Sequence, residues 1–188
     1  MGNGIKGVPI STPELEALLR QIISPVRLAA IPAVTLAAAG DYAALDVMSN
    51  SATANAGLPI YVKELAREPG GVATIKSITA RCSIAAVLAS LRLHFFRELP
   101  LVAEVEMDDN AAFSLSDADA QKVVAVIPFT LADSGAATGA NSFAHVLGVN
   151  AGFTCVGSAD LRMLIKVKNA YVPANAEVLM PRFKIMQL

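Results

Sequence analysis

The feature that most constrains the fold is a succession of short, strand-like apolar segments between residues 26 and 188. In residues 87–96, Leu91, Leu93 and Phe95 fall on one side of an extended chain, and Arg92, His94 and Phe96 on the other. Such alternation is typical of a strand with one buried face. About eight segments have a strand-like pattern, namely residues 26–38, 59–67, 70–85, 87–96, 122–131, 145–156, 161–172 and 176–186.

The segments are separated by short stretches rich in Gly, Pro, Asn or Asp, such as residues 67–71 and 132–141. These residues favour turns, and no helical pattern intervenes between the segments. Many short strands joined by turns predict an antiparallel, jelly-roll-like β-sandwich of about eight strands. The chain is therefore expected to be mainly β.

The first 25 residues have a different pattern. Residues 1–10 are rich in glycine and predict an extended arm. Residues 11–23 predict one short amphipathic helix, with either a capping box from Ser11 and Glu14 or an alternative start at Thr12 and Pro13. One apolar stripe recurs at helical spacing and Pro25 ends the pattern; the stripe comprises Leu15, Leu18, Leu19, Ile22 and Ile23. We expect an arm and helix over residues 1–25 and a sandwich domain over residues 26–188.

The composition favours a protein that buries surface in an assembly. Apolar residues make up 54% of the chain and charged residues 16%, against about 25% charged in ordinary soluble domains. A membrane-spanning helix needs about 20 mostly apolar residues, but the longest uncharged run, residues 134–159, is interrupted by glycines, His145 and two asparagines. The net charge of −1 gives no basic stripe for nucleic acid. We therefore expect neither a membrane nor a nucleic-acid partner.

Few residues suggest catalysis. Cys82 and Cys155 lack zinc-binding spacing and predict buried free thiols. His94 and His145 are isolated from one another and from the cysteines, which argues against a metal site. There is no nucleophile elbow, and the glycine-rich loops lack the strand-to-helix context of a phosphate loop. The sequence predicts no catalytic residue, no cofactor and no metal, and hence no enzyme.

The acidic stretch from Met107 to Gln121 is the one plausible exception, because it holds four carboxylate residues. Registers starting at Asp108 or Asp117 both fail the calcium-loop pattern, so only a loose calcium site stays open. Ser116 and Asp119 instead have the spacing of a helix N-cap. The favoured interpretation is a capped turn anchored by Phe113 and Leu115. The carboxylates are expected to be solvated or to contact a neighbour; they are Asp108, Asp109, Asp117 and Asp119.

Several segments together resemble a family of tailed-bacteriophage virion structural proteins of the capsid cement or decoration type. The resemblance extends over about residues 40–188 and is carried by residues 40–54, 70–80, 91–100, 108–129 and 167–185. It implies a jelly-roll-like subunit on the capsid exterior, assembled in the host cytoplasm. The family is assigned no catalytic residues. The N-terminal helix departs from the simplest version of the family pattern.

This resemblance implies that the partners are the major capsid protein and further copies of the chain, as a dimer or trimer. The arm and helix are expected to pack on a neighbouring subunit or on the capsid shell, through Ile5, Val8, Ile10, Leu15, Leu18, Leu19 and Ile22. A tail- or neck-associated virion protein is one alternative. A carbohydrate-binding jelly-roll module is another, although aromatic residues make up 5% of the chain and tryptophan is absent. A metal-dependent enzyme of the cupin type would need a His/Glu cluster.

Overall fold

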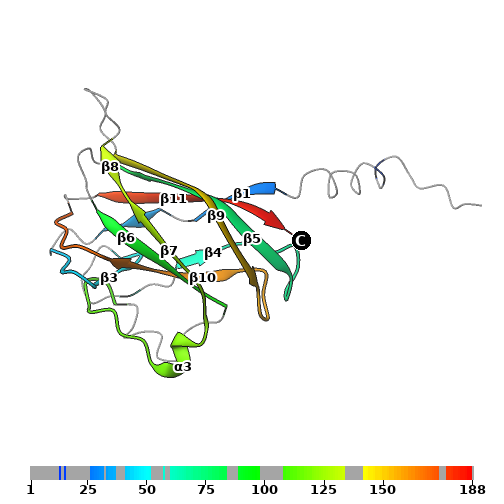
Figure 1. The fold of residues 1–188 in the computed structure, drawn as a ribbon, viewed down its shortest axis with the longest axis horizontal. Helices are drawn as coiled ribbons and strands as arrows, with labels where there is room; N and C mark the ends of the chain where they lie inside the picture. The colour runs from blue at the N-terminus through cyan, green and yellow to red at the C-terminus, as the bar shows by residue number, and fades with distance from the viewer. Residues whose placement is uncertain are drawn as a thin grey trace, which may run out of the picture.

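The protein is a sandwich of two antiparallel β-sheets (Figure 1). The computed structural model describes residues 13, 15, 26–31, 33–36, 41–51, 57, 60–83, 89–97, 108–133, 142–173 and 177–187. Pro13 and Leu15 are both in helical conformation, as the amphipathic pattern predicts. The rest of the predicted arm and helix lies outside the described residues.

The first sheet contains six strands. Its path runs from β1 (Val26–Ala30) through β11 (Val178–Gln187), β5 (Val72–Cys82) and β9 (Ser142–Thr154) to β8 (Ala132–Asp133). The short strand β2 (Val34–Thr35) continues the line of β1 and also pairs with β11. The long strands β11 and β5 therefore lie inside this sheet, with β9 beside β5.

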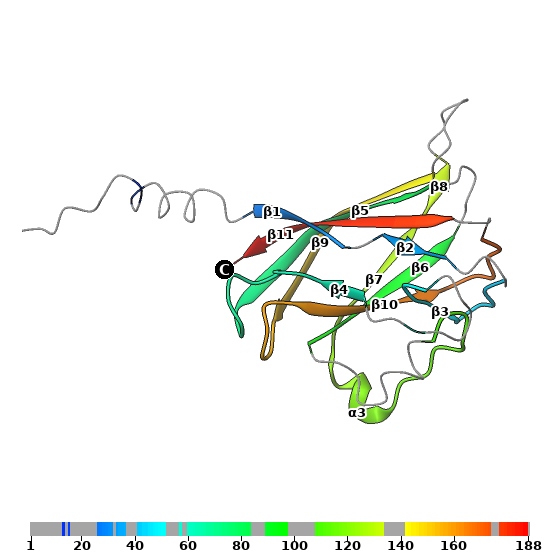
Figure 2. The ribbon, with the colours of Figure 1, turned by 180° about the vertical axis from the view of Figure 1, so that it is seen from behind.

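The second sheet contains five strands. Its path runs from β3 (Val47–Met48) through β10 (Leu161–Val167) and β6 (Ser90–Phe96) to β7 (Val123–Thr130). The short strand β4 (Ile60–Val62) also pairs with β10. Figure 2 shows this sheet beneath the first, with the helix α3 (Asp117–Ala120) beyond its outer side.

The strand pairing is that of a jelly roll. Strands early in the chain pair with strands late in it: β1 with β11, β3 and β4 with β10, β5 with β9, and β6 with β7. A jelly roll has this order because it corresponds to a long antiparallel hairpin that is rolled up. Both strands of each pair then lie in the same sheet. The predicted jelly-roll-like sandwich is confirmed. Each predicted strand segment contains a strand, and the short strands β3 and β8 are additional.

The core lies between the sheets and follows from alternation along the strands. In β6 the side chains of Leu91, Leu93 and Phe95 are buried, while Arg92 points to solvent, as the sequence predicts. Phe183 of β11 meets Phe95 edge-on across the interior, with ring centroids 5.6 Å apart. One continuous apolar cluster thus joins the two sheets.

A β-bulge in β5 changes which side chains reach the outside of the first sheet. The register with β11 shifts here, because Ser77 pairs with Lys184 and Ile75 with Ile185, which leaves Lys76 as an extra residue in β5. Ile75 and Ile78 both stay buried, so the two residues between them, Lys76 and Ser77, point away from the core. An extra residue in one strand produces this local departure from alternation.

Candidate functional site

The acidic stretch forms a capped helical turn, as predicted. Ser116 is the N-cap of α3, and its hydroxyl oxygen accepts a hydrogen bond from the backbone N–H of Asp119 at 3.1 Å. Asp117 and Asp119 lie in the first turn, where the helix dipole favours negative charge. The spacing of Ser116 and Asp119 in the sequence therefore identified the local structure correctly.

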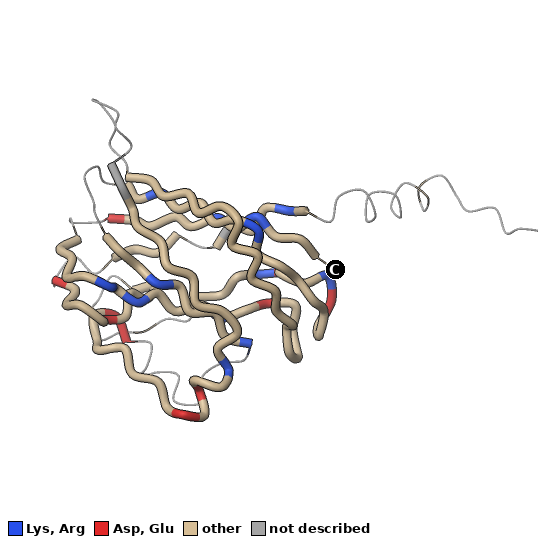
Figure 3. The backbone as a smooth tube through the Cα atoms, in the orientation of Figure 1, with Lys and Arg blue, Asp and Glu red and all other residues tan. Residues whose placement is uncertain are grey.

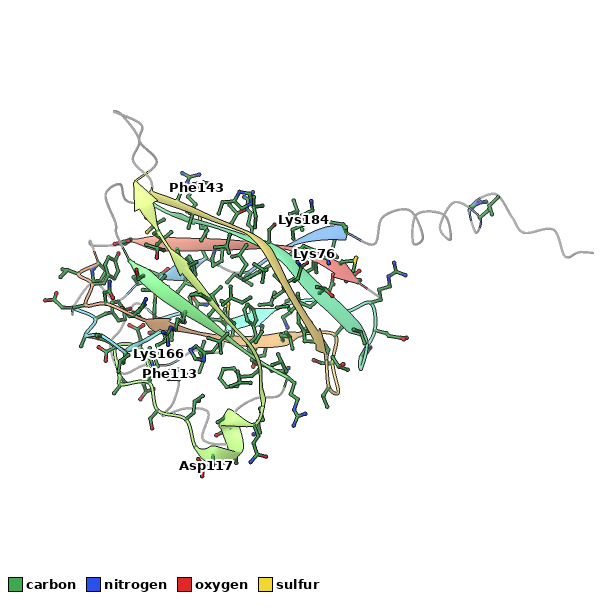
Figure 4. All side chains as sticks on the ribbon, in the orientation of Figure 1. Lys76, Phe113, Asp117, Phe143, Lys166 and Lys184 are labelled. Atoms are coloured by element: carbon green, nitrogen blue, oxygen red, sulfur yellow. The ribbon has the colours of Figure 1, made fainter. Side chains whose placement is uncertain are left out.

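The same stretch covers part of the outer side of the second sheet. Phe113 and Leu115 pack against a small buried cluster made by Val47, Phe96 and Leu164. The backbone N–H of Phe113 also donates to the carbonyl of Leu45 at 2.9 Å. The predicted anchoring by Phe113 and Leu115 is confirmed, and Figure 4 shows Phe113 beside this sheet with Asp117 farther out.

The expectation that all four carboxylates of the stretch are solvated or contact a neighbour is wrong for Asp109 and Asp119, which are fully buried within the subunit. Asp109 accepts hydrogen bonds from the Tyr42 hydroxyl at 2.8 Å and from the backbone N–H of Ser49 at 2.9 Å. Asp119 accepts from the Lys122 ammonium at 2.7 Å. Buried carboxylates require such partners. The partners of Asp109 are far away in sequence, since Tyr42 and Ser49 precede it by 67 and 60 positions. Asp117 is exposed, and Asp108 is half-buried.

Burial raises the pKa of Asp109 to about 6, against the hydrogen bonds from Ser49 and Tyr42, which lower it. A pKa raised in the folded state stabilises the fold below the unfolded pKa of 3.8, and this contribution is lost as the pH rises through about 6. Asp109→Asn should remove this dependence. Between pH 4 and pH 7, wild type should lose about 2 kcal/mol of unfolding free energy relative to Asp109→Asn in urea titrations. Parallel pH profiles for the two proteins would contradict the assignment.

The two cysteines are buried free thiols, as predicted. The Cys82 sulfur lies 2.6 Å from a carboxylate oxygen of Glu177, which is also fully buried. Burial raises the pKa of the Cys155 thiol above its ordinary value. Both thiols are therefore enclosed in the interior, which is typical of a structural cysteine.

The two histidines lie on opposite sides of the molecule and do not share a site. His94 is half-buried on β6, 4.6 Å from the Phe113 ring, and burial together with the charges of Lys166 and Arg92 lowers its pKa to about 4. His145 is exposed on β9. Among the described residues, no group of three or more His, Cys, Asp or Glu side chains could hold a metal ion.

The most distinctive surface is the solvent-facing side of the first sheet, here called the outer face. Large apolar side chains stand exposed on it: Leu28 is 71% exposed, Leu147 72% and Phe143 45%. Two open depressions lie side by side there, of about 350 and 200 Å³. The outer face comprises Leu28, Ser77, Thr79, Arg81, Phe143, His145, Leu147, Met180, Arg182 and Lys184.

The strand register places these side chains in rows across β1, β11, β5 and β9. One row contains Leu28, Lys184, Ser77 and Leu147 in direct register. The next has Arg182, Thr79 and His145, and a third has Met180, Arg81 and Phe143. The cations therefore lie on the central strands β5 and β11. Leu28 on β1 flanks them on one side, and Phe143 and Leu147 on β9 flank them on the other. This arrangement exists only when β1, β5, β9 and β11 are paired.

The outer face is cationic as well as apolar. Arg81, Arg182 and Lys184 are exposed on it, and Lys76 lies nearby with its ammonium 3.1 Å from the Asn150 side-chain oxygen. No carboxylate is present among the described side chains that point outward from β1, β5, β9 and β11. Figure 3 shows the basic positions along this sheet, and Figure 4 shows Phe143 and Lys184 on its side of the sandwich. Overall the chain is nearly neutral, so the charge is local.

Sequence reasoning did not identify the outer face. The predicted interface was the N-terminal stripe, of which the structure describes Leu15, 43% exposed. The other predicted interface residues lie outside the described residues: Ile5, Val8, Ile10, Leu18, Leu19 and Ile22. Residues such as Arg81, Phe143 and Arg182 come from three strands distant in sequence. The available signal was a large apolar or basic residue at an outward position of a strand.

In the part of the chain that the structure describes, no helix has the length and apolar character needed to cross a bilayer. Comparison with known proteins adds no assignment: no family model matches the chain, and no curated protein matches its sequence.

Proposed function

We propose that this protein is a structural subunit of a virion, which binds the outside of a capsid and stabilises it by bridging capsid subunits. The observation that carries the proposal is the outer face, a broad apolar and cationic surface on a rigid jelly roll. The resemblance of residues 40–188 to virion cement proteins supports the same role. Jelly-roll domains occur in viral capsid proteins, lectins and cupins, so the fold is compatible with it.

The outer face has the composition of a protein–protein interface. Exposed apolar patches on soluble proteins mark interaction sites, and interface cores are enriched in Phe, Met and Arg. Phe143, Met180 and Arg182 are adjacent on the outer face. Arginine and aromatic side chains also contribute the largest shares of binding energy in many interfaces. These features favour a binding role, with the groups on β5, β9 and β11 making contact.

The test is binding to isolated capsid shells that lack this subunit. The purified wild-type protein is expected to co-sediment with the shells and to raise the temperature at which they disassemble. The double variant Leu147→Ser, Arg182→Glu should bind at least about tenfold more weakly, because it removes one apolar group that the contact would bury and reverses one charge.

The matched control is Val172→Ser, Lys168→Glu. Val172 is 67% exposed, much like Leu147, but it follows β10 and lies away from the outer face, and Lys168 is also exposed. This control should bind as wild type does. Failure of the wild-type protein to bind any shell would overturn the proposed function. Equal loss in both double variants would show that the outer face is not the surface used.

A further inference from the structure

We infer that the outer face of one copy binds the N-terminal segment of a second copy, residues 11–23, so that neighbouring subunits exchange these segments. The inference rests on the proposed assembly role and gives the outer face a contact with a neighbouring subunit within that assembly, so variants on this face are expected to weaken shell binding through the loss of that contact. It brings together two surfaces that contain apolar side chains. One is the exposed, partly cationic face of the first sheet, and the other is the amphipathic sequence of residues 11–23.

The chemistry of the two surfaces is complementary. In a helix over residues 11–23, Leu15, Leu18, Leu19 and Ile22 form one apolar stripe. Successive residues of a helix are separated by about 100° of rotation, so Glu14 and Glu16 lie on the two flanks of Leu15. The segment contains one cation, Arg20, and has a net charge of −1 from two glutamates and one arginine. The outer face offers exposed apolar groups next to Arg182 and Lys184.

The dimensions of the two surfaces also agree. A helix of 13 residues is about 20 Å long, at about 1.5 Å per residue. Its apolar stripe from Leu15 to Ile22 spans seven residue steps, about 10 Å, and Phe143 and Leu147 lie four residues apart on β9, about 13 Å in a strand. Along β9, Phe143 and Leu147 form an apolar edge beside the row of cations. A helix lying along β9 can place its stripe on this edge and a flanking glutamate toward the cations.

A second copy fits better than the same chain, because little chain is left for a reversal. Val26 is already paired with Met186 at the end of the first sheet. Between the predicted helix and this pair lie only Ser24 and Pro25. Pro25 has a fixed φ and disfavours helical backbone at Ser24, so a helix that bound its own sheet would have to reverse direction within these two residues. Binding to a second copy does not require this reversal.

Exchange gives a symmetric contact at low cost. When each copy offers the same segment and the same face, two subunits related by a twofold axis make two identical contacts. The total contact area is then twice that of a single contact, and no other surface of the subunit is needed. Continued head-to-tail exchange would instead form a ring around a higher symmetry axis. Either form links neighbouring subunits directly.

The test uses site-directed disulfides between full-length chains. One preparation contains Leu19→Cys and the other, with a different affinity tag, contains His145→Cys; the native cysteines Cys82 and Cys155 are buried. After mixing under a mild oxidant, a covalent heterodimer is expected on a non-reducing gel. Leu19→Cys mixed with Val172→Cys is the matched control, since position 172 is exposed away from the outer face. Equal cross-linking in both mixtures, or none in either, would overturn the inference.

The double variant Leu19→Cys, His145→Cys in one chain tests the alternative occupant. Disulfide-linked dimers or larger species are expected, whereas a monomer with an internal disulfide would show that the segment binds its own sheet and would overturn the exchange. Sedimentation velocity of free protein gives an independent measurement. Glu14→Lys, Glu16→Lys and, separately, Arg182→Glu should each weaken self-association, and combining them should restore part of the loss.

The two proposals can fail separately. Self-association of the free protein is measured without any capsid, and shell binding is measured by co-sedimentation. If wild type binds shells and the cross-link is absent, the proposed function stands and the exchange is wrong. If the cross-link forms and wild type binds no shell, the capsid role is wrong and the exchange stands as a property of the free protein.

Discussion

Replacement of Phe183 by alanine is expected to lower the free energy of unfolding by about 4 kcal/mol. Phe183 is fully buried in β11 and meets the ring of Phe95 at 81°, with centroids 5.6 Å apart. The loss combines the transfer of a large apolar group with the cavity left between two sheets that cannot close on it. Urea unfolding followed by fluorescence or circular dichroism measures the change.

Phe143→Ala is the control, because it removes the same side chain from the outer face, where 45% of it is exposed. It should change the unfolding free energy of the monomer by less than about 1 kcal/mol. Similar losses of unfolding free energy for the two variants would mean that burial between the sheets does not increase the stabilisation that a phenylalanine side chain provides. A small loss for Phe183→Ala would contradict the packing described above.

Lys122→Met is expected to destabilise the protein by about 3 kcal/mol. The Lys122 ammonium lies 2.7 Å from a carboxylate oxygen of Asp119, whose side chain is fully buried, while that of Lys122 is 11% exposed. Removing the lysine alone leaves a buried carboxylate without this cation, which costs far more than an exposed pair is worth. Thermal unfolding of both proteins at pH 7 measures the difference.

Two controls separate the buried pair from general effects of charge. Asp117→Asn alters an exposed carboxylate of the same helix and should cost less than about 1 kcal/mol. The double variant Asp119→Asn, Lys122→Met removes both charges and should be more stable than Lys122→Met alone, because no unpaired charge stays buried. A double variant less stable than either single one would argue against a simple ion pair.

The fold was predictable because its strands show alternation that a single sequence reveals. In β6 the alternation of Leu91, Leu93 and Phe95 with polar residues marks both the strand and its buried face. Turn-forming residues between the segments indicate short antiparallel connections. The N-cap at Ser116 was equally visible, since it depends on residues three positions apart. Each of these features is local.

The features that sequence reasoning missed depend on pairing between distant residues. Asp109 looked like a solvated loop residue, yet Tyr42 enters the same interior site from 67 positions earlier in the chain. The outer face has the same origin, because Arg182 meets Thr79 and His145 only through the register of three strands. The spacing of residues in the sequence does not indicate which strands become neighbours in a sheet. Charge and apolar surface on one face therefore stayed undetected.

The position of β11 inside the first sheet has a consequence for folding kinetics. β1 and β5 are joined only through β11, and the contacts of β11 with them span up to 160 positions, as between Val26 and Met186. Loops of this length must close before the strand pairs can form stabilising contacts. This entropy cost makes proteins of high contact order slow to fold. During synthesis, β1 and β5 emerge long before the strand that unites them. The part of the outer face that carries Arg182 and Lys184 cannot form before β11 has been synthesised, so a nascent chain lacks these two cations on that face.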